Sequence, residues 1–159
     1  MKRSRRFLAP AIVIMGILVG LFAYVSFSHH EPALSLIKQP ENTVLKSSRE
    51  LVIPQNQSSV ISAAEQASFV RNGKDVNVTV VRTISLSAAN SLFQTLRASY
   101  VAQDLHTQNL TLTGQSLEFY DQGRPYLILL TKSNYLEISV SNDEALALDS
   151  ARAQITGLN

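Results

Sequence analysis

The sequence predicts an α+β protein: one N-terminal transmembrane helix, then a small antiparallel sheet of about five or six strands covered by two helices. An uncharged apolar run at residues 7–27 predicts the membrane helix. Behind it, several segments alternate apolar and polar residues as strands do, and two segments carry apolar residues at helical spacing. In chain order the elements after the membrane helix are expected to follow the pattern ββαββββα.

Residues 7–27 are long enough to cross a bilayer as a helix. At about 1.5 Å per residue such a helix measures roughly 31 Å, which matches the thickness of the hydrocarbon core. Four basic residues lie within residues 1–6, and the positive-inside rule then places this tail in the cytoplasm and the C-terminal domain outside. The alternative is a signal peptide cut near Ser28, which would release a secreted protein, although its apolar region usually spans only about 7–15 residues.

A GxxxG spacing lies inside the apolar run, at Gly16 and Gly20. Small residues at this spacing let the backbones of two membrane helices approach closely, so the pair is a candidate helix-dimer contact. Glycine is also frequent in membrane helices that have no such partner, and packing against lipid is the alternative interpretation.

The chain is expected to divide into a cytoplasmic tail at 1–6, a signal-anchor at 7–27, an extracytoplasmic linker at 28–57 and an α+β domain at 58–159. The linker contains three prolines and many Gln, Asn, Ser and Glu residues, so it is expected to be largely extended. Short apolar pieces within it, such as residues 51–53, could dock on the domain.

Charge and cysteine content exclude several classes of function. The chain has 14 basic and 12 acidic residues, and the tail at 1–6 holds four of the basic ones, so the rest carries a net charge of about −2. This balance argues against nucleic-acid binding. The absence of cysteine excludes disulfides, thiolate metal sites and thiol nucleophiles.

A β-hairpin is predicted around Asn72-Gly73, because both central residues of a type I′ turn need positive φ. The valines that follow alternate with polar residues, as in a half-buried strand. Pairing across the turn sets Phe69 opposite Val76, Ala67 opposite Val78 and Ile61 opposite Ile84. For residues 59–70 an Ala-rich helix is the alternative.

The first helix of the domain is predicted from a Ser87 cap to about Gln103. Its apolar face comprises Ala89, Leu92, Phe93, Leu96 and Tyr100. Four strands are then expected around residues 110–112, 117–119, 126–130 and 136–140. The third of these is apolar on both faces, which predicts a central strand.

The second helix is predicted to begin with a capping box formed by Ser141 and Glu144. Its apolar face would comprise Leu148, Ala151 and Ile155. Since each helix has one apolar face, both are expected to cover the same face of the sheet.

No catalytic, cofactor or metal-binding residue is assigned. His29 and His30 lie at the expected membrane exit without further metal ligands nearby in the sequence. His106 follows the first helix and is the one candidate for a catalytic base. Glu118 and Glu137 fall on the polar faces of predicted strands, where solvated side chains are expected.

Tyr120 and Tyr135 are a candidate interaction surface. By the alternation of their strands, both are expected to point away from the apolar face, onto an uncovered face of the sheet. Tyrosine suits binding surfaces because it combines apolar area with a hydrogen-bonding tip.

These observations favour a non-enzymatic binding module: an exported domain held at the cell membrane as an accessory subunit of an envelope protein complex. The expected partners are the membrane, through residues 7–27, and a protein of unknown identity, without nucleic acid or cofactor. A ligand- or lipid-sensing exported domain and an envelope hydrolase using His106 are the alternatives.

Overall fold

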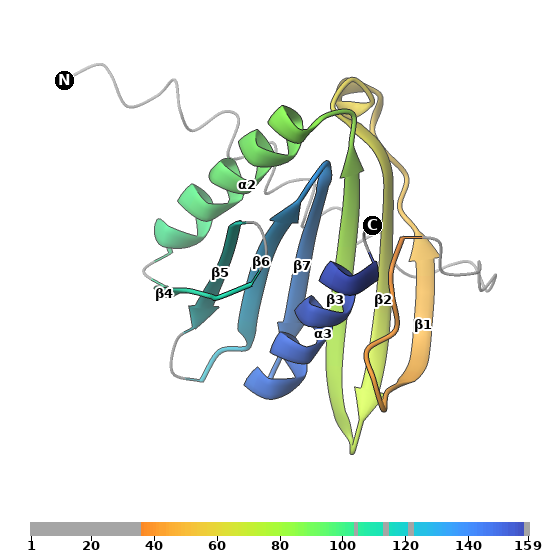
Figure 1. Cartoon of the computed structure of the whole chain (residues 1–159), viewed down its shortest axis with the longest axis vertical. Helices are drawn as coiled ribbons and strands as arrows, with labels where there is room; N and C mark the ends of the chain where they lie inside the picture. Colours follow the sequence, from red (N-terminus) through yellow and green to blue (C-terminus); the bar gives the residue numbers. More distant parts are fainter. Residues whose placement is uncertain (1–35, 104, 113–114, 121–122, 158–159) are drawn as a thin grey trace.

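The structure is a computed structural model that describes residues 36–103, 105–112, 115–120 and 123–157. It contains a seven-stranded antiparallel sheet and two α-helices, which confirms the predicted α+β class (Figure 1). The predicted membrane helix at 7–27 lies outside the described residues. Within the described ranges, no helix has both the length and the apolar character needed to span a membrane.

The strands lie side by side in the order β1-β2-β3-β7-β6-β5-β4. Their bounds are β1 Val44–Glu50, β2 Ile61–Arg71, β3 Lys74–Thr83, β4 His106–Asn109, β5 Gln115–Tyr120, β6 Tyr126–Lys132 and β7 Tyr135–Ser141. The helices are the short 3-10 helix η1 (Gln55–Gln57), α2 (Leu86–Val101) and α3 (Glu144–Gly157).

The expected number of strands was too low because β1 lies within the segment predicted as a linker. This strand pairs with β2 at the edge of the sheet and is largely polar and partly exposed. A register shift occurs between Leu45 and Ser47, so the pairing is interrupted at Lys46. A bulge and an outward lysine are devices that keep an edge strand from pairing with other chains.

The β2–β3 hairpin has the predicted register near its turn. Phe69 pairs with Val76 and Ala67 with Val78, and the positive φ angles of Asn72 (52°) and Gly73 (75°) fit the predicted turn. At the far end a second register shift makes Ile61 pair with Thr83 rather than with Ile84. Residues 61–71 form a strand, so the helical alternative for this segment is wrong.

The two helices lie on opposite faces of the sheet, and the prediction that they share one face is wrong. Phe93 of α2 packs in a cluster with Leu129, whereas Ala147 of α3 packs in a cluster with Ile128. Ile128 and Leu129 are consecutive residues of β6 and therefore point to opposite faces. Strand β6 is apolar on both faces because each face has its own helix. Figure 1 shows α3 lying across β3 and β7.

Both helices begin at different caps from those predicted. Ser85, not Ser87, caps α2, and its hydroxyl accepts a hydrogen bond from Ala88 N at 3.1 Å. At α3 the carboxylate of Asp143 accepts from Leu146 N at 2.8 Å. The Ser141 hydroxyl instead accepts from Asp143 N at 3.0 Å, so the capping box predicted for Ser141 does not form.

The buried face of α3 comprises Leu146, Ala147, Ser150, Ala151 and Gln154, so of the predicted apolar face of Leu148, Ala151 and Ile155 only Ala151 is buried. Two other predictions agree with the structure, and one strand is displaced. The buried residues of α2 are Ala89, Phe93 and Leu96, all from the predicted apolar face. Strand β6 is interior and holds four buried residues in a row, residues 128–131, as expected of a central strand at 126–130. The strand expected at 110–112 lies earlier, at β4, and Leu110 and Leu112 pack beside the α3 cluster instead.

Candidate functional site

The chain that leads into the domain is bound to it at residues 36–38. The N–H groups of Leu36 and Ile37 donate to Oε2 of Glu65, at 2.7 and 2.9 Å. Lys38 N donates to Oε1 of Gln154 at 2.7 Å, and Nε2 of Gln154 donates back to the Lys38 carbonyl at 2.6 Å. We call these four hydrogen bonds the N-terminal clamp.

The clamp works because it satisfies backbone groups that are removed from water. Ile37 is buried among the apolar residues of β2 and β3, and Gln154 is fully buried in α3. The amide of Gln154 presents one donor and one acceptor to Lys38, as a neighbouring strand would. Unpaired polar groups at this depth would cost free energy. The clamp therefore fixes the chain against α3 and β2 at a defined point.

Two further carboxyl groups, those of Glu118 and Glu137, are buried on the face of the sheet that carries α3, the same face as Glu65. Oε1 of Glu137 accepts a hydrogen bond from the Ser139 hydroxyl at 2.5 Å, and the hydroxyls of Ser139 and Ser150 lie 3.2 Å apart. Oε2 of Glu118 accepts from Nε2 of Gln108 at 2.5 Å. The second oxygen of each glutamate has no hydrogen-bond partner within the described residues.

Burial changes the acidity of both groups. It raises the pKa of Glu137 to about 8, because the charged form loses its hydration, and it raises the pKa of Glu118 as well. The expectation of solvated strand faces was wrong for these residues, since each is 1% exposed. Strand β6 lies between the strands that carry them. Both carboxyl groups are therefore shielded from solvent in the folded domain.

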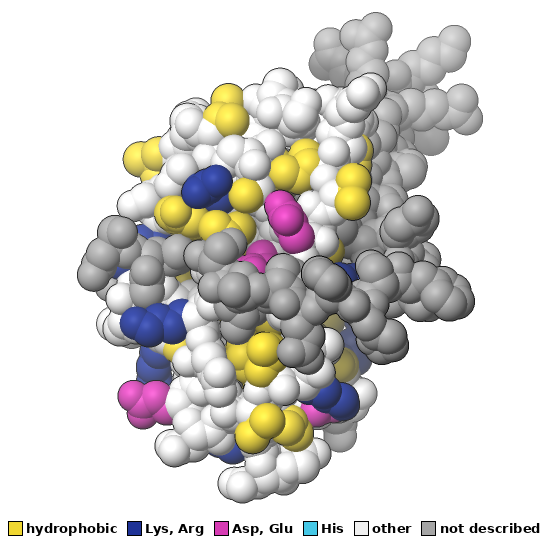
Figure 2. All heavy atoms as spheres, turned by 90° about the vertical axis from the view of Figure 1, so that its right-hand side faces the viewer, with side chains coloured by type: hydrophobic (Ala, Val, Ile, Leu, Met, Phe, Trp, Pro, Cys, Tyr) yellow, Lys and Arg dark blue, Asp and Glu magenta, His cyan; other side chains and the backbone are white. Residues whose placement is uncertain are grey.

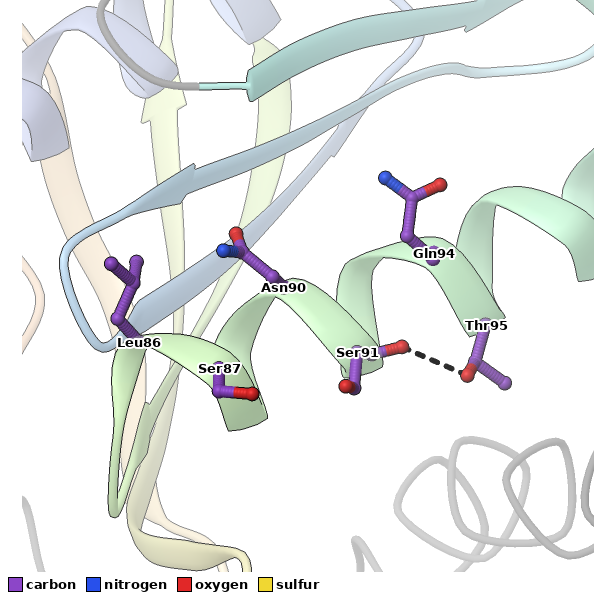
Figure 3. A pocket seen from close by; sticks show the side chains of 6 residues that line it. All are labelled: Leu86, Ser87, Asn90, Ser91, Gln94 and Thr95. Carbon is purple, nitrogen blue, oxygen red and sulfur yellow. Dashed lines mark hydrogen bonds between the residues drawn. The ribbon is translucent and has the colours of Figure 1, made fainter.

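A shallow open hollow runs along the outer side of α2 (Figure 3). It is lined by Leu86, Ser87, Asn90, Ser91, Gln94 and Thr95. Beside it, Gln115 at the start of β5 accepts from Nε2 of Gln94 at 2.9 Å and donates to Oδ1 of Asn90 at 3.3 Å. This bridge holds two amide side chains in place along the helix.

The lining of the hollow offers hydrogen bonding and one apolar contact. Its amides and hydroxyls can donate and accept, and Leu86 is more than half exposed at one end. All six lining side chains are uncharged and none titrates near neutral pH. Such a surface can bind a partner but carries no acid, base or nucleophile activated by a base.

The structure does not bring the two predicted tyrosines together. Tyr120 ends β5 and Tyr135 begins β7, and these strands run parallel to one another because each is antiparallel to β6. The two residues therefore lie near opposite ends of the sheet. Both are on the face that carries α3, and Tyr135 packs against the buried cluster around Ile37.

His106 lies in β4 with its ring 5.5 Å from the Tyr120 ring, between centroids, at the exposed edge of the sheet. In the parts of the chain that the structure describes, no three His, Asp or Glu side chains gather to hold a metal ion. Gly16, Gly20, His29 and His30 lie outside the described residues.

Sequence reasoning missed the clamp and the bridge at Gln115. The polar character of Asn90 and Gln94 was visible as the outer face of the predicted helix, but Gln115 joins them only in the folded chain.

No model of a known protein family matches this chain, and no curated protein sequence matches it.

Proposed function

We propose that this protein is a single-pass membrane-anchored, extracytoplasmic binding subunit of an envelope protein complex, without catalysis of its own. The observation that carries the proposal is the uncharged polar hollow along α2. Its side chains are suited to recognising a partner by hydrogen bonds, and they lack groups that would activate a substrate.

The N-terminal clamp supports attachment close to the membrane. Between the predicted membrane helix and the first clamped residue lie only residues 28–35. Eight residues extend to at most about 30 Å. The part of the predicted linker that precedes the clamp is therefore much shorter than the whole segment 28–57 would be if extended. A short tether raises the effective concentration of a weak binding surface near a membrane partner.

Two observations argue against the alternative that the protein is a hydrolase with His106 as its catalytic base. The histidine lies on an exposed edge strand against Tyr120, and the carboxyl groups of Glu118 and Glu137 are buried away from solvent. A general base needs a group that orients it and a concave site for substrate.

The test is site-specific photo-crosslinking of the full-length protein in the cells that make it. A photoreactive amino acid at Gln94 reports on the hollow, and the same amino acid at Arg152 is the matched control, because Arg152 is exposed on α3 on the opposite face. We expect one discrete protein adduct from position 94 and none from position 152. Absence of an adduct from position 94, or the same pattern from both positions, would overturn the proposal.

A further inference from the structure

One end of the sheet carries several exposed aliphatic side chains, beside the exposed charged residues Glu50 and Arg82. Four exposed apolar side chains lie there: Val52 (82% exposed), Val60 (39%), Ile84 (61%) and Leu86 (56%). We call this group the aliphatic end. The two chain segments that carry these residues lie side by side, because Ile84 N donates a hydrogen bond to the Val60 carbonyl at 3.0 Å. Leu86 begins α2 just after Ile84.

Two segments that form the aliphatic end are uncharged, although the exposed Glu50 and Arg82 directly precede them. Residues 51–64 and 83–96 include no Lys, Arg, His, Asp or Glu. Figure 2 shows hydrophobic side chains exposed in the upper part of the view, with a Lys or Arg side chain among them; this is the end at which the chain between β1 and β2 turns in Figure 1. The four aliphatic side chains themselves carry no charge into an apolar phase.

The opposite end of the sheet has the reverse character. Around the β2–β3 turn, Lys46 pairs with Asp75 at 3.1 Å and Arg71 pairs with Asp149 at 2.9 Å. Lys74 also pairs with Asp143 there. These ionised groups favour water, so the molecule is polarised along the direction of its strands.

The clamp lies nearer to the aliphatic end. Leu36 is bound to Glu65, which is four residues from the start of β2 at Ile61 and six from its end at Arg71. At about 3.4 Å per residue these separations are roughly 14 and 20 Å. Residues 28–35 can extend to about 30 Å, so the aliphatic end can meet the bilayer surface while the chain remains clamped.

We infer that the aliphatic end rests on the extracytoplasmic surface of the bilayer, with its four side chains at the boundary between lipid headgroups and acyl chains. This inference depends on the membrane anchor of the proposed function. Exposed aliphatic groups leave water when they enter this boundary, which is favourable. Because a short tether raises the effective concentration of this surface at the bilayer, a small contact area is enough for binding. The hollow on α2 would then face a partner beside the membrane.

The test uses single-cysteine variants, since the natural chain has no cysteine. The full-length protein is reconstituted into vesicles of phosphatidylethanolamine and phosphatidylglycerol that contain a lipid with a nitroxide quencher at the headgroup boundary. An environment-sensitive fluorophore is attached at Ile84→Cys, and the matched control is Lys74→Cys at the charged end. A third site, Leu18→Cys, reports on the predicted membrane helix.

We expect severalfold stronger quenching at position 84 than at position 74, with strong quenching at position 18. Equal quenching at positions 84 and 74, with position 18 quenched, would overturn this inference and leave the anchor standing. An unquenched position 18 would overturn both. Adding Leu86→Asp to the Ile84→Cys variant should reduce quenching to the level of position 74, because it places a charge at the surface. Asp is favourable in the first turn of a helix, so the fold should be retained.

Discussion

The two faces of the sheet are built differently, although each is covered by one helix. On the α2 face the buried residues are mostly apolar, among them Phe93, Leu129 and Leu136, and the buried polar side chains are the uncharged Thr83 and Thr131. On the α3 face, buried glutamates, serines and Gln154 are mixed with the apolar residues. The α2 face is a conventional hydrophobic core, whereas the α3 face uses polar groups to hold a second segment of chain, residues 36–38.

The largest effect is expected at the centre of the α2 face. Replacing Phe93 by Ala leaves a cavity beneath the helix, and such changes cost about 3–5 kcal/mol of unfolding free energy. Urea unfolding followed by the tyrosine near-ultraviolet signal measures it, since four of the five tyrosines lie in the described domain. Replacing the exposed Arg97 of the same helix by Ala is the control. A loss below about 1 kcal/mol for Phe93→Ala would mean that α2 does not complete the core.

A smaller effect is expected at the clamp on the α3 face. Gln154→Ala leaves the N–H and C=O of Lys38 without partners, at a cost of about 2–4 kcal/mol in unfolding free energy. Hydrogen exchange at residues 36–38 should rise sharply while exchange in β6 stays slow. Arg152→Ala, on the exposed side of α3, should change neither quantity. Unchanged protection of residues 36–38 in the Gln154 variant would contradict the clamp.

The smallest effect is a pH dependence specific to the α3 face. Burial raises the pKa of Glu137 to about 8 in the folded protein, from the ordinary value of 4.5. The folded state therefore binds more protons than the unfolded state between these values, and stability falls as pH rises through this window. Below about pH 4.5 and above about pH 8 this group contributes no slope.

The Glu137→Gln variant is neutral at every pH, so it should remove most of this slope and raise the unfolding free energy at pH 8 by about 1–3 kcal/mol. Unfolding midpoints measured across pH 4.5–8.5 test it. Glu118, whose pKa burial also raises, leaves a residual slope of the same sign. The exposed Glu144→Gln is the control. An identical slope in Glu137→Gln and the natural protein would refute the assignment.

Local features of the fold could be predicted from the sequence, and long-range ones could not. The hairpin at Asn72-Gly73 was predictable because turn geometry and the alternation of valines are written into neighbouring residues. The placement of α2 and α3 was not, because helical spacing reveals an apolar face but not which side of the sheet it meets. The segment of β6 is apolar on both faces, and this pattern indicated that both faces of the sheet are covered.

The polar part of the α3 face was hidden for a related reason. Glu118 and Glu137 each lie between two apolar residues of their strand, and this alternation normally indicates a solvated face. Folding removes both from water: α3, which packs on β7, begins several residues after Glu137, and Gln108 of β4 donates a hydrogen bond to Glu118. The clamp joins Lys38 to Gln154 across 116 positions, so no window of sequence contains both partners. Likewise, β1 is an edge strand whose polar residues resemble a linker.

The pairing of Lys38 with Gln154 also sets an order of events. A chain is made from its N-terminus, so residues 36–38 emerge long before α3 exists. Until Gln154 arrives, the N–H and C=O of Lys38 have no amide to meet, and the entering segment stays unattached. Residues 36–38, the first described residues of the domain, are thus the last to be bound. Loss of the final turns of α3 would leave Lys38 without its Gln154 hydrogen bonds.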